Sequence, residues 1–281
     1  MTIATEWVTY GETQEVGYLA RPVSPKGEQA PLPAVLVVQE IWGVDGHIQD
    51  VTRRFAAAGY VALAPDLYAK NGARPAALTE SRVAFAQAFL EGLPHATWFD
   101  PAARATAFAT NPEPQRTELE ETFQALFGAF VSGGLKLEAW LPAVRAAATY
   151  VREECPASRG AGGTRVATVG FCMGGGLAAL HACADPELAA AVIFYGSAPP
   201  AEQIKHIQCP VLGLYGSTDE RINAGIPAFA AAMKDAGKSF EHHIYEGAGH
   251  AFFNDNRGSY HAGASRDAFL RTLELLRKQL V

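Results

Sequence analysis

A chain of 281 residues with 49% hydrophobic and 19% charged residues is long enough to bury one large α/β core. Its formal net charge of −6 argues against nucleic acid or an anionic membrane as a partner. The first residues lack the basic and apolar regions of a secretory signal, and no apolar run approaches the roughly 20 residues that span a bilayer. The four cysteines form no CxxC pair, which disfavours a metal site. These features predict a cytoplasmic protein.

The N-terminal quarter of the chain reads as strands with one helix between them. Residues 6–22 alternate loosely and contain two glycines, which predicts an antiparallel hairpin at the edge of a sheet. Residues 33–38 and 60–65 are short apolar runs, typical of strands covered on both faces. Between these two runs, residues 47–58 have helical spacing and end before Gly59, a plausible C-cap.

Residues 70–137 interrupt this succession of strands and helices because they contain no good strand. Helix-like pieces at 80–90 and 118–130 are separated by prolines, and eight aromatic residues are scattered through the segment. Such a length exceeds an ordinary connection between a strand and a helix. We expect a helical cap inserted into a single α/β domain that spans residues 1–281. Most of the aromatic residues are expected to pack the insert, and a few to line the mouth of a pocket.

Strand-like and helical segments alternate again in the second half of the chain. The expected strands are residues 166–169, 190–195, 211–215 and 240–245, with helices near 173–183, near 225–235 and at the C-terminus. Repeated alternation of this kind predicts a mostly parallel, doubly wound sheet with right-handed crossovers.

The segment from Val166 to Gly176 breaks from an apolar strand into a cysteine flanked by glycines. This pattern is typical of a nucleophile elbow, in which a sharp strand-to-helix turn presents one reactive side chain. Gly170 and Gly174 are small because a side chain would collide across the turn. A buried structural cysteine is the alternative, but the glycines and the following helix favour Cys172 as a nucleophile. The amide of Met173 is then expected to face a developing oxyanion.

A base and its orienting acid are expected after later strands, in the order nucleophile, acid, histidine. Asp219 ends the strand and turn that begin at Val211, and His250 ends the glycine-bearing turn after Tyr245. Both follow parallel strands at the edge where Cys172 lies.

Other acids and histidines fit less well. His242 and His243 face opposite sides of one strand and cannot bind one metal together. Asp66 precedes the nucleophile and is expected to fix the turn into the insert. Asp255 is a competing acid.

Glu40 directly follows an apolar strand, so its carboxylate is expected at the same edge as Cys172. One interpretation is that Glu40 accepts the proton of the Cys172 thiol. The other is that it caps or pairs with a neighbouring loop. Ile41 lies where a second oxyanion-hole amide is found in this fold.

The segments QEIWG (39–43), APDLY (64–68), GFCMGG (170–175) and GHAF (249–252) resemble the dienelactone hydrolase family, the carboxymethylenebutenolidases of the α/β-hydrolase superfamily. The likeness covers about residues 6–68 and 138–281. It implies a triad of Cys172, His250 and Asp219, and a Glu40 that keeps the resting thiol protonated until substrate disturbs the pair. It also implies an oxyanion hole from the amides of Ile41 and Met173.

The same likeness implies that Trp42 lines the pocket. Two features depart from the family pattern. The insert is longer, and Asn254 stands where the family has an arginine that binds a substrate carboxylate. Arg257 or Arg82 is the expected substitute for that arginine.

The sequence thus predicts a hydrolase of small-molecule esters or lactones that acts through a thioester and needs no cofactor. A thiol-redox protein and a non-catalytic ligand-binding homologue are the alternatives.

Overall fold

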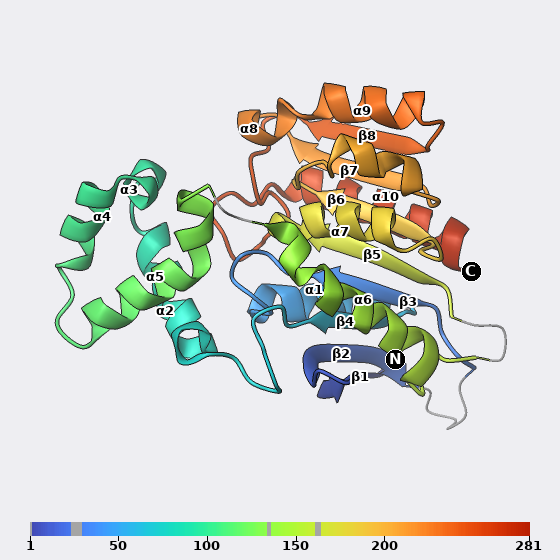
Figure 1. The fold of residues 1–281 in the computed structure, drawn as a ribbon, viewed down its shortest axis with the longest axis horizontal. Helices are drawn as coiled ribbons and strands as arrows, with labels where there is room; N and C mark the ends of the chain where they lie inside the picture. The colour runs from blue at the N-terminus through green and yellow to red at the C-terminus, as the bar shows by residue number, and fades with distance from the viewer. Residues whose placement is uncertain (1, 24–29, 134–135, 161–163) are drawn as a thin grey trace. The chain divides into compact units, whose positions relative to one another are not determined.

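The computed structural model describes residues 2–23, 30–133, 136–160 and 164–281. The chain folds into two compact units, one of residues 1–67 with 137–281 and one of residues 68–136. The first unit contains the sheet and the second is helical (Figure 1). In the described part of the chain, no helix combines the length and apolarity needed to cross a membrane.

The first unit is built on an eight-stranded sheet with the order β1-β2-β4-β3-β5-β6-β7-β8. The strands are β1 (Thr2–Tyr10), β2 (Glu15–Val23), β3 (Ala34–Val38), β4 (Val61–Pro65), β5 (Val166–Phe171), β6 (Ala190–Phe194), β7 (Val211–Gly216) and β8 (Phe240–Tyr245). Strands β1 and β2 form the expected antiparallel hairpin at one edge, and β2 pairs antiparallel with β4. All pairs from β4 to β8 are parallel. The prediction of a mostly parallel, doubly wound sheet is confirmed.

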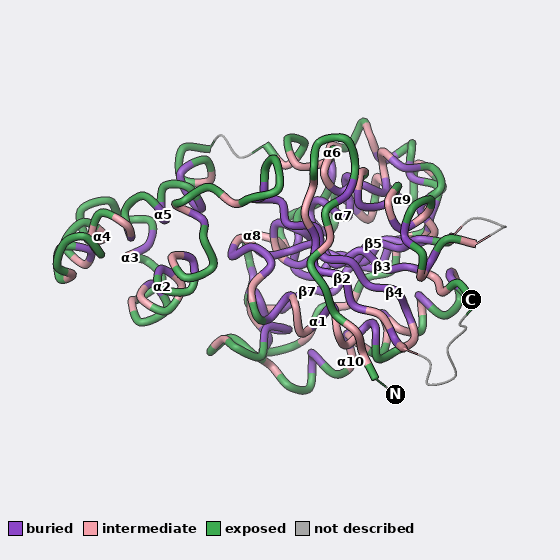
Figure 2. The backbone as a smooth tube through the Cα atoms, turned by 90° about the horizontal axis from the view of Figure 1, so that it is seen from below, coloured by how far each residue is buried: buried purple, intermediate pink, exposed green. Residues whose placement is uncertain are grey.

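Helices cover both faces of the sheet, and the alternation of side chains along β3 shows how. Val35 and Val37 belong to one apolar core with α1 (Gly46–Ala57) and α10 (Ala262–Leu280). Leu36 belongs to the opposite core, which includes the other helices of this unit. These are α6 (Leu141–Thr149), α7 (Met173–Ala184), the short α8 (Glu220–Asn223) and α9 (Ile226–Asp235). Figure 2 shows the strands as the most buried layer. The sequence analysis did not anticipate α6.

The two ends of helix α1 are set by Asp45 and Gly59. The side chain of Asp45 accepts a hydrogen bond from the backbone N–H of Ile48 at 3.0 Å, which caps the first turn. Gly59 follows the last turn with φ of +100°, a conformation that favours glycine. Because β3 enters this helix through residues 39–45, the cap also fixes the loop that carries Glu40.

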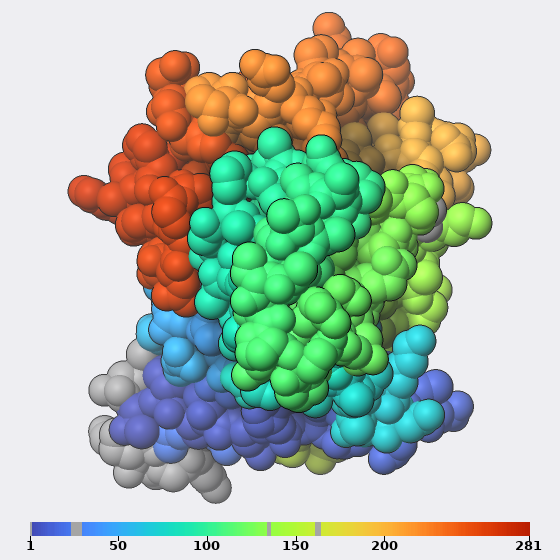
Figure 3. Space-filling model, turned by 90° about the vertical axis from the view of Figure 1, so that its left-hand side faces the viewer, coloured from blue at the N-terminus to red at the C-terminus, as the bar shows by residue number. Residues whose placement is uncertain are grey.

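The second unit consists of helices held together by aromatic side chains. Its helices are α2 (Glu80–Glu91), α3 (His95–Phe99), α4 (Pro101–Phe108) and α5 (Gln115–Val131). The ring of Phe123 lies 5.0 Å from that of Phe127 and 5.8 Å from that of Phe108, and Trp98 lies 5.8 Å from Phe127. These rings therefore pack among themselves within the unit, whose helices form one continuous surface in Figure 3. The sequence indicated α2 and α5 but missed the short α3 and α4.

Candidate active site

Cys172 sits in a strained turn between β5 and α7. Its backbone has φ of 55° and ψ of −115°, a combination that costs about 1–3 kcal/mol for a residue with a side chain. The turn is possible because two glycines surround it. A Cβ at Gly170 would lie 1.8 Å from the carbonyl oxygen of Gly174, and a Cβ at Gly174 would lie 2.3 Å from that of Val38. The thiol is therefore presented at the end of β5 by a turn that only this glycine spacing permits.

The same turn places the start of α7 against the end of β3. The carbonyl of Cys172 accepts hydrogen bonds from the amides of Gly175 and Gly176 at 3.0 and 3.3 Å. The amide of Met173, the first residue of α7, has no acceptor within the helix. A free N–H at a helix N-terminus favours negative charge nearby. The sulfur of Cys172 and any oxyanion formed beside it lie in this field.

Asp219 and His250 come together from two different loops at the same edge. Oδ2 of Asp219 lies 2.5 Å from Nδ1 of His250, and the Asp219 side chain is almost fully buried. The loops are joined by a hydrogen bond from the amide of Thr218 to the carbonyl of Ala248 at 3.0 Å. Because the carboxylate accepts a hydrogen bond from Nδ1–H, Nε2 of His250 is left as the nitrogen that can exchange a proton with another group.

The charge state of His250 depends on both neighbours. Burial opposes protonation of the imidazole, but negative charge on Cys172 and the hydrogen bond to Asp219 outweigh it and raise the pKa of His250 to about 10. The Cys172 side chain also acts as a hydrogen-bond partner of this ring. The imidazole is therefore cationic at neutral pH for as long as the sulfur is an anion.

Backbone strain at this edge is not confined to the cysteine. Tyr195, directly after β6, has φ of 39°, and Ala251, directly after His250, has φ of 60°. Both residues are buried, and neither is a glycine. Non-glycine residues with positive φ persist only where the surrounding structure holds them. Three such residues thus lie at the ends of β5 and β6 and beside the histidine.

Glu40 lies directly after β3, and both of its carboxylate oxygens accept hydrogen bonds from buried side chains. The hydroxyl of Tyr195 donates to Oε1 at 3.0 Å, and the side-chain amide of Asn254 donates to Oε2 at 2.9 Å. Among the described residues of this unit, no hydrogen bond joins Glu40 to the sulfur of Cys172. The side chain is 2% exposed.

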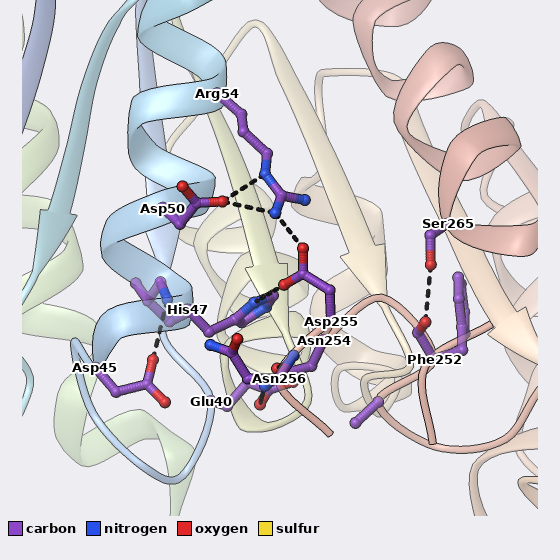
Figure 4. Close-up of polar contacts among 12 residues, drawn as sticks. Glu40, Asp45, His47, Asp50, Arg54, Phe252, Asn254, Asp255, Asn256 and Ser265 are labelled. Atoms are coloured by element: carbon purple, nitrogen blue, oxygen red, sulfur yellow. Dashed lines mark hydrogen bonds and ion pairs between the residues drawn. The ribbon is translucent and has the colours of Figure 1, made fainter. Parts of the chain in front are cut away.

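The loop that supplies Asn254 is fixed to helix α1. Asp255 accepts hydrogen bonds from Arg54 and from Nδ1 of His47, the latter at 3.3 Å. Figure 4 shows Asp255 between these two side chains, with Glu40 and Asn254 next to His47. Asp255, which the sequence offered as a competing acid, therefore anchors the loop after His250 to helix α1. The acid that pairs with His250 is Asp219. No pattern in the sequence predicted that Asn254 and Tyr195 would meet at Glu40.

The remaining predicted residues occupy different environments. Ile41 and Trp42 are the central residues of a turn closed by the hydrogen bond from the amide of Gly43 to the carbonyl of Glu40 at 3.2 Å, and Trp42 is buried.

Burial and the charge of Glu40 raise the pKa of Tyr195 well above its usual value, whereas the positive charge of Arg257 acts in the opposite direction. Arg257 therefore lies close enough to influence this site.

Arg82 lies in the second unit, where it connects two helices. Its guanidinium donates to the carbonyl of Glu118 and to the carboxylate of Glu121, each at 2.7 Å. It thus fastens α2 to α5. His242 and His243 lie on β8, as the sequence indicated, and His243 is 2.8 Å from Glu241. In the described ranges, no group of three or more His, Cys, Asp or Glu residues could hold a metal ion.

Cys183 and Cys209 are poorly placed to react with Cys172. Cys183 is 11 positions along α7, about 16 Å at 1.5 Å per residue, whereas a disulfide needs Cα atoms within about 7 Å. Cys209 precedes β7 and so lies at the opposite edge of the sheet. Burial raises the pKa of Cys183 to about 11 and that of Cys209 to about 12.

A doubly wound sheet with a strained strand-to-helix turn, followed by an acid and a histidine after later strands, defines the α/β-hydrolase fold. Comparisons with known proteins agree. A family model described as the dienelactone hydrolase family matches residues 16–280. A protein of Saccharolobus solfataricus provisionally named carboxymethylenebutenolidase is 34% identical over 274 residues, which cover 93% of each chain. A relative with the same provisional name from Escherichia coli K12 is 33% identical, over 89% of this chain and 78% of its own.

A solved structure supports the same conclusion. The crystal structure of a provisionally assigned dienelactone hydrolase from Klebsiella pneumoniae subsp. pneumoniae MGH 78578 matches with a TM-score of 0.69 and 27% identity, covering 99% of this chain and all of that one. The chain therefore belongs to the dienelactone hydrolase family, as its motifs indicated, and is a hydrolase of that family.

Proposed function

We propose that this protein hydrolyses esters or lactones through a thioester on Cys172. The observation that supports this most directly is the strained turn of Cys172 together with the Asp219–His250 pair at the same edge of the sheet. Strain and buried polar groups are found together where a structure maintains a reactive geometry.

Acylation follows from these positions. The sulfur of Cys172 attacks the substrate carbonyl carbon, and the carbonyl oxygen becomes an oxyanion facing the amides of Met173 and Ile41. Each such donor contributes about 3–4 kcal/mol to lowering the barrier. The bond to the leaving oxygen then breaks, and that oxygen takes the proton from Nε2 of His250. The products of this step are an alcohol, or the freed hydroxyl of an opened lactone, and a thioester.

Deacylation uses the same histidine in its neutral form. Once the sulfur is acylated it carries no charge, so the main cause of the raised pKa of His250 disappears. The neutral imidazole accepts a proton from water as the water oxygen attacks the thioester carbon. The C–S bond then breaks, which releases the acid product and returns the sulfur of Cys172 as an anion beside the protonated imidazole. The hydrogen bond to Asp219 keeps the ring oriented throughout.

Two residues supply substrate contacts in this proposal. Trp42 provides an apolar wall next to the oxyanion amides, and Arg257 provides a positive charge for an anionic substituent of the substrate. Arg82 would serve this purpose only after leaving Glu121. Neither a redox role nor a pure binding role is favoured, because Cys183 and Cys209 are distant and the acid–histidine pair is intact.

The test is turnover of p-nitrophenyl acetate and of a simple lactone by the wild type, Cys172→Ala and Cys183→Ala. Cys172→Ala should lower kcat by roughly 10⁴-fold or more, since the nucleophile is lost. Cys183→Ala removes a thiol from the far end of the same helix and should leave turnover unchanged. Equal turnover in wild type and Cys172→Ala would refute the assignment.

A further inference from the structure

Strand β8 ends the sheet, and in the described part of the chain no strand lies on the side of β8 that is turned away from β7. The amide of Val211 donates to the carbonyl of Ser239 at 3.0 Å, and the amide of Ser217 donates to the carbonyl of Tyr245 at 2.9 Å. Because backbone groups alternate in direction along a strand, the odd-numbered residues of β8 bond to β7. The N–H and C=O groups of the even-numbered residues therefore point away from the sheet.

The outward residues of β8 are Phe240, His242 and Ile244, and their side chains form a row that is only partly covered. The ring of Phe240 lies 4.4 Å from that of Phe229 on α9 and 5.3 Å from that of His242, to which it is nearly parallel at 16°. Ile244, at the other end of the row, is 49% exposed. Proteins commonly protect an edge strand with proline or lysine, and β8 contains neither. Its outer side is thus suited to pairing with another strand.

The sequence of β8 is complementary to itself when a second copy runs in the opposite direction. An antiparallel pair centred on His242 places Phe240 opposite Ile244 of the second copy, and His242 opposite its own equivalent. Each pair of outward residues is then of the hydrogen-bonded kind, with two N–H···O=C bonds between the strands. The half-exposed Ile244 is covered by an aromatic ring, a favourable cross-strand pair.

The same register brings unlike charges together. Glu241 lies opposite His243 of the second copy, and that imidazole is 3.0 Å from the guanidinium of Arg271. Just beyond the ends of the strand, Lys238 lies opposite Glu246. Each pair occurs twice, because the arrangement has a two-fold axis. The charges around β8 therefore favour a second copy of this chain as its partner.

Neighbouring registers lose these matches. Shifting one strand by two residues places Glu241 opposite Glu241 of the second copy in one direction, and in the other it places Phe240 opposite Glu246. We propose that two copies of this chain pair through β8, antiparallel and centred on His242, so that their sheets join into one. Main-chain hydrogen bonds supply the affinity and the side-chain pairs supply the register. The ladder is short, so the Kd should be micromolar.

The first experiment measures the mass of the protein by sedimentation equilibrium from about 1 to 100 µM, where a monomer–dimer equilibrium is expected. His242→Pro removes the outward N–H at the centre of the ladder, a position where an edge strand tolerates proline, and should raise the Kd at least about tenfold. His242→Ala keeps that N–H and is the matched control, with a Kd within about threefold of the wild type.

Charge reversal tests the register while leaving the backbone unchanged. Lys238→Glu and Glu246→Lys each create two like-charged contacts per dimer, so each variant alone should have a Kd at least about tenfold higher. When the two variants are mixed in equal amounts, every such contact joins unlike charges again. A heterodimer should then form with a Kd close to that of the wild type. Glu12→Lys, in the turn between β1 and β2, is the charge control and should leave the Kd unchanged.

A wild type that stays monomeric throughout the concentration series would overturn the proposal. A dimer whose Kd is insensitive to Lys238→Glu and Glu246→Lys would also overturn it, because the two copies would then meet through another surface. If each variant were monomeric and their mixture formed no heterodimer, the antiparallel register would be wrong. These measurements need no ester, so their outcome is independent of the proposed function.

Discussion

The two edges of the sheet differ in how deeply their polar side chains are buried. At the carboxyl edge, Glu40 and Asp219 are buried, and the non-glycine residues Cys172 and Tyr195 have positive φ. At the amino edge, the starts of β7 and β8 and the end of α10 border a hollow of about 230 Å³. Its lining includes charged side chains of the ordinary exposed kind, such as Glu241, which is 70% exposed.

The difference shows that the groups that would destabilise the fold, buried carboxylates and strained turns, are gathered at the carboxyl edge. Glu241 has a lowered pKa because of His243, yet such an exposed pair contributes little to stability. By contrast, buried carboxylates and strained turns would each destabilise the fold unless neighbours held them. Because both edges belong to the same parallel strands, the strand sequences alone do not explain the asymmetry. It arises in the loops that follow the strands.

The largest effect is expected at the carboxyl edge from Asp219→Asn. An amide at this position favours the wrong tautomer of His250, so kcat for an ester should fall roughly 10³–10⁴-fold while the protein stays folded. Glu241→Gln makes the same chemical change at the amino edge and should alter kcat less than about twofold. Comparable losses in both variants would contradict the contrast between the edges.

Gly174→Ala should come next, since it affects both stability and turnover. The added Cβ would lie 2.3 Å from the carbonyl oxygen of Val38, so α7 must shift away from β3 and carry Cys172 with it. We expect a loss of about 3 kcal/mol in urea unfolding and a fall in turnover of at least 10²-fold. Gly225→Ala is the control, because its nearest contact would be 3.5 Å away.

The helical unit offers a region whose interior is held together largely by aromatic packing. Phe123 is 4% exposed, stacks on Phe127, and has the guanidinium of Arg104 4.3 Å from its ring centre. Phe123→Ala should cost this unit about 3 kcal/mol, visible as faster hydrogen exchange over residues 80–131. Phe85 is 38% exposed, so Phe85→Ala should have little effect on the rate of hydrogen exchange.

The smallest effect on stability and turnover is expected from Arg271→Ala, which changes a residue that lines the hollow at the amino edge. Arg271 pairs with Asp267 at 2.6 Å, but its side chain is 36% exposed. The free energy of unfolding should change by less than about 1 kcal/mol, and turnover should not change. A marked loss of turnover would mean that the amino edge takes part in function and that the comparison is wrong.

The sequence predicted the parts of this fold that depend on local patterns. Apolar runs identified β3 to β7, and the spacing of Gly170, Cys172 and Gly174 indicated the strained turn. Short helices such as α3 and α4 were missed, because prolines separate pieces too brief to show a helical period. The partners of Glu40 were missed for a different reason. Tyr195 is 155 positions away and Asn254 is 214 positions away, and no local pattern encodes such a meeting.

The order of Cys172, Asp219 and His250 along the chain anticipated that the last two would meet, since each follows a parallel strand. Their mutual distance of 2.5 Å depends on how two loops pack, and that packing is a property of the folded unit. For the same reason, the positive φ of Tyr195 could not be read from an apolar run that looks like any buried strand.

The central claim is that Cys172 carries the acyl group during hydrolysis. The most direct measurement is the mass of His250→Gln after brief exposure to p-nitrophenyl acetate, whose good leaving group permits acylation although the base for deacylation is gone. The account predicts one stable acetyl group per chain, located on the peptide that contains Cys172 and absent when Cys172→Ala is combined with His250→Gln. An acetyl group on any other residue, or steady turnover without an acyl-enzyme, would contradict it.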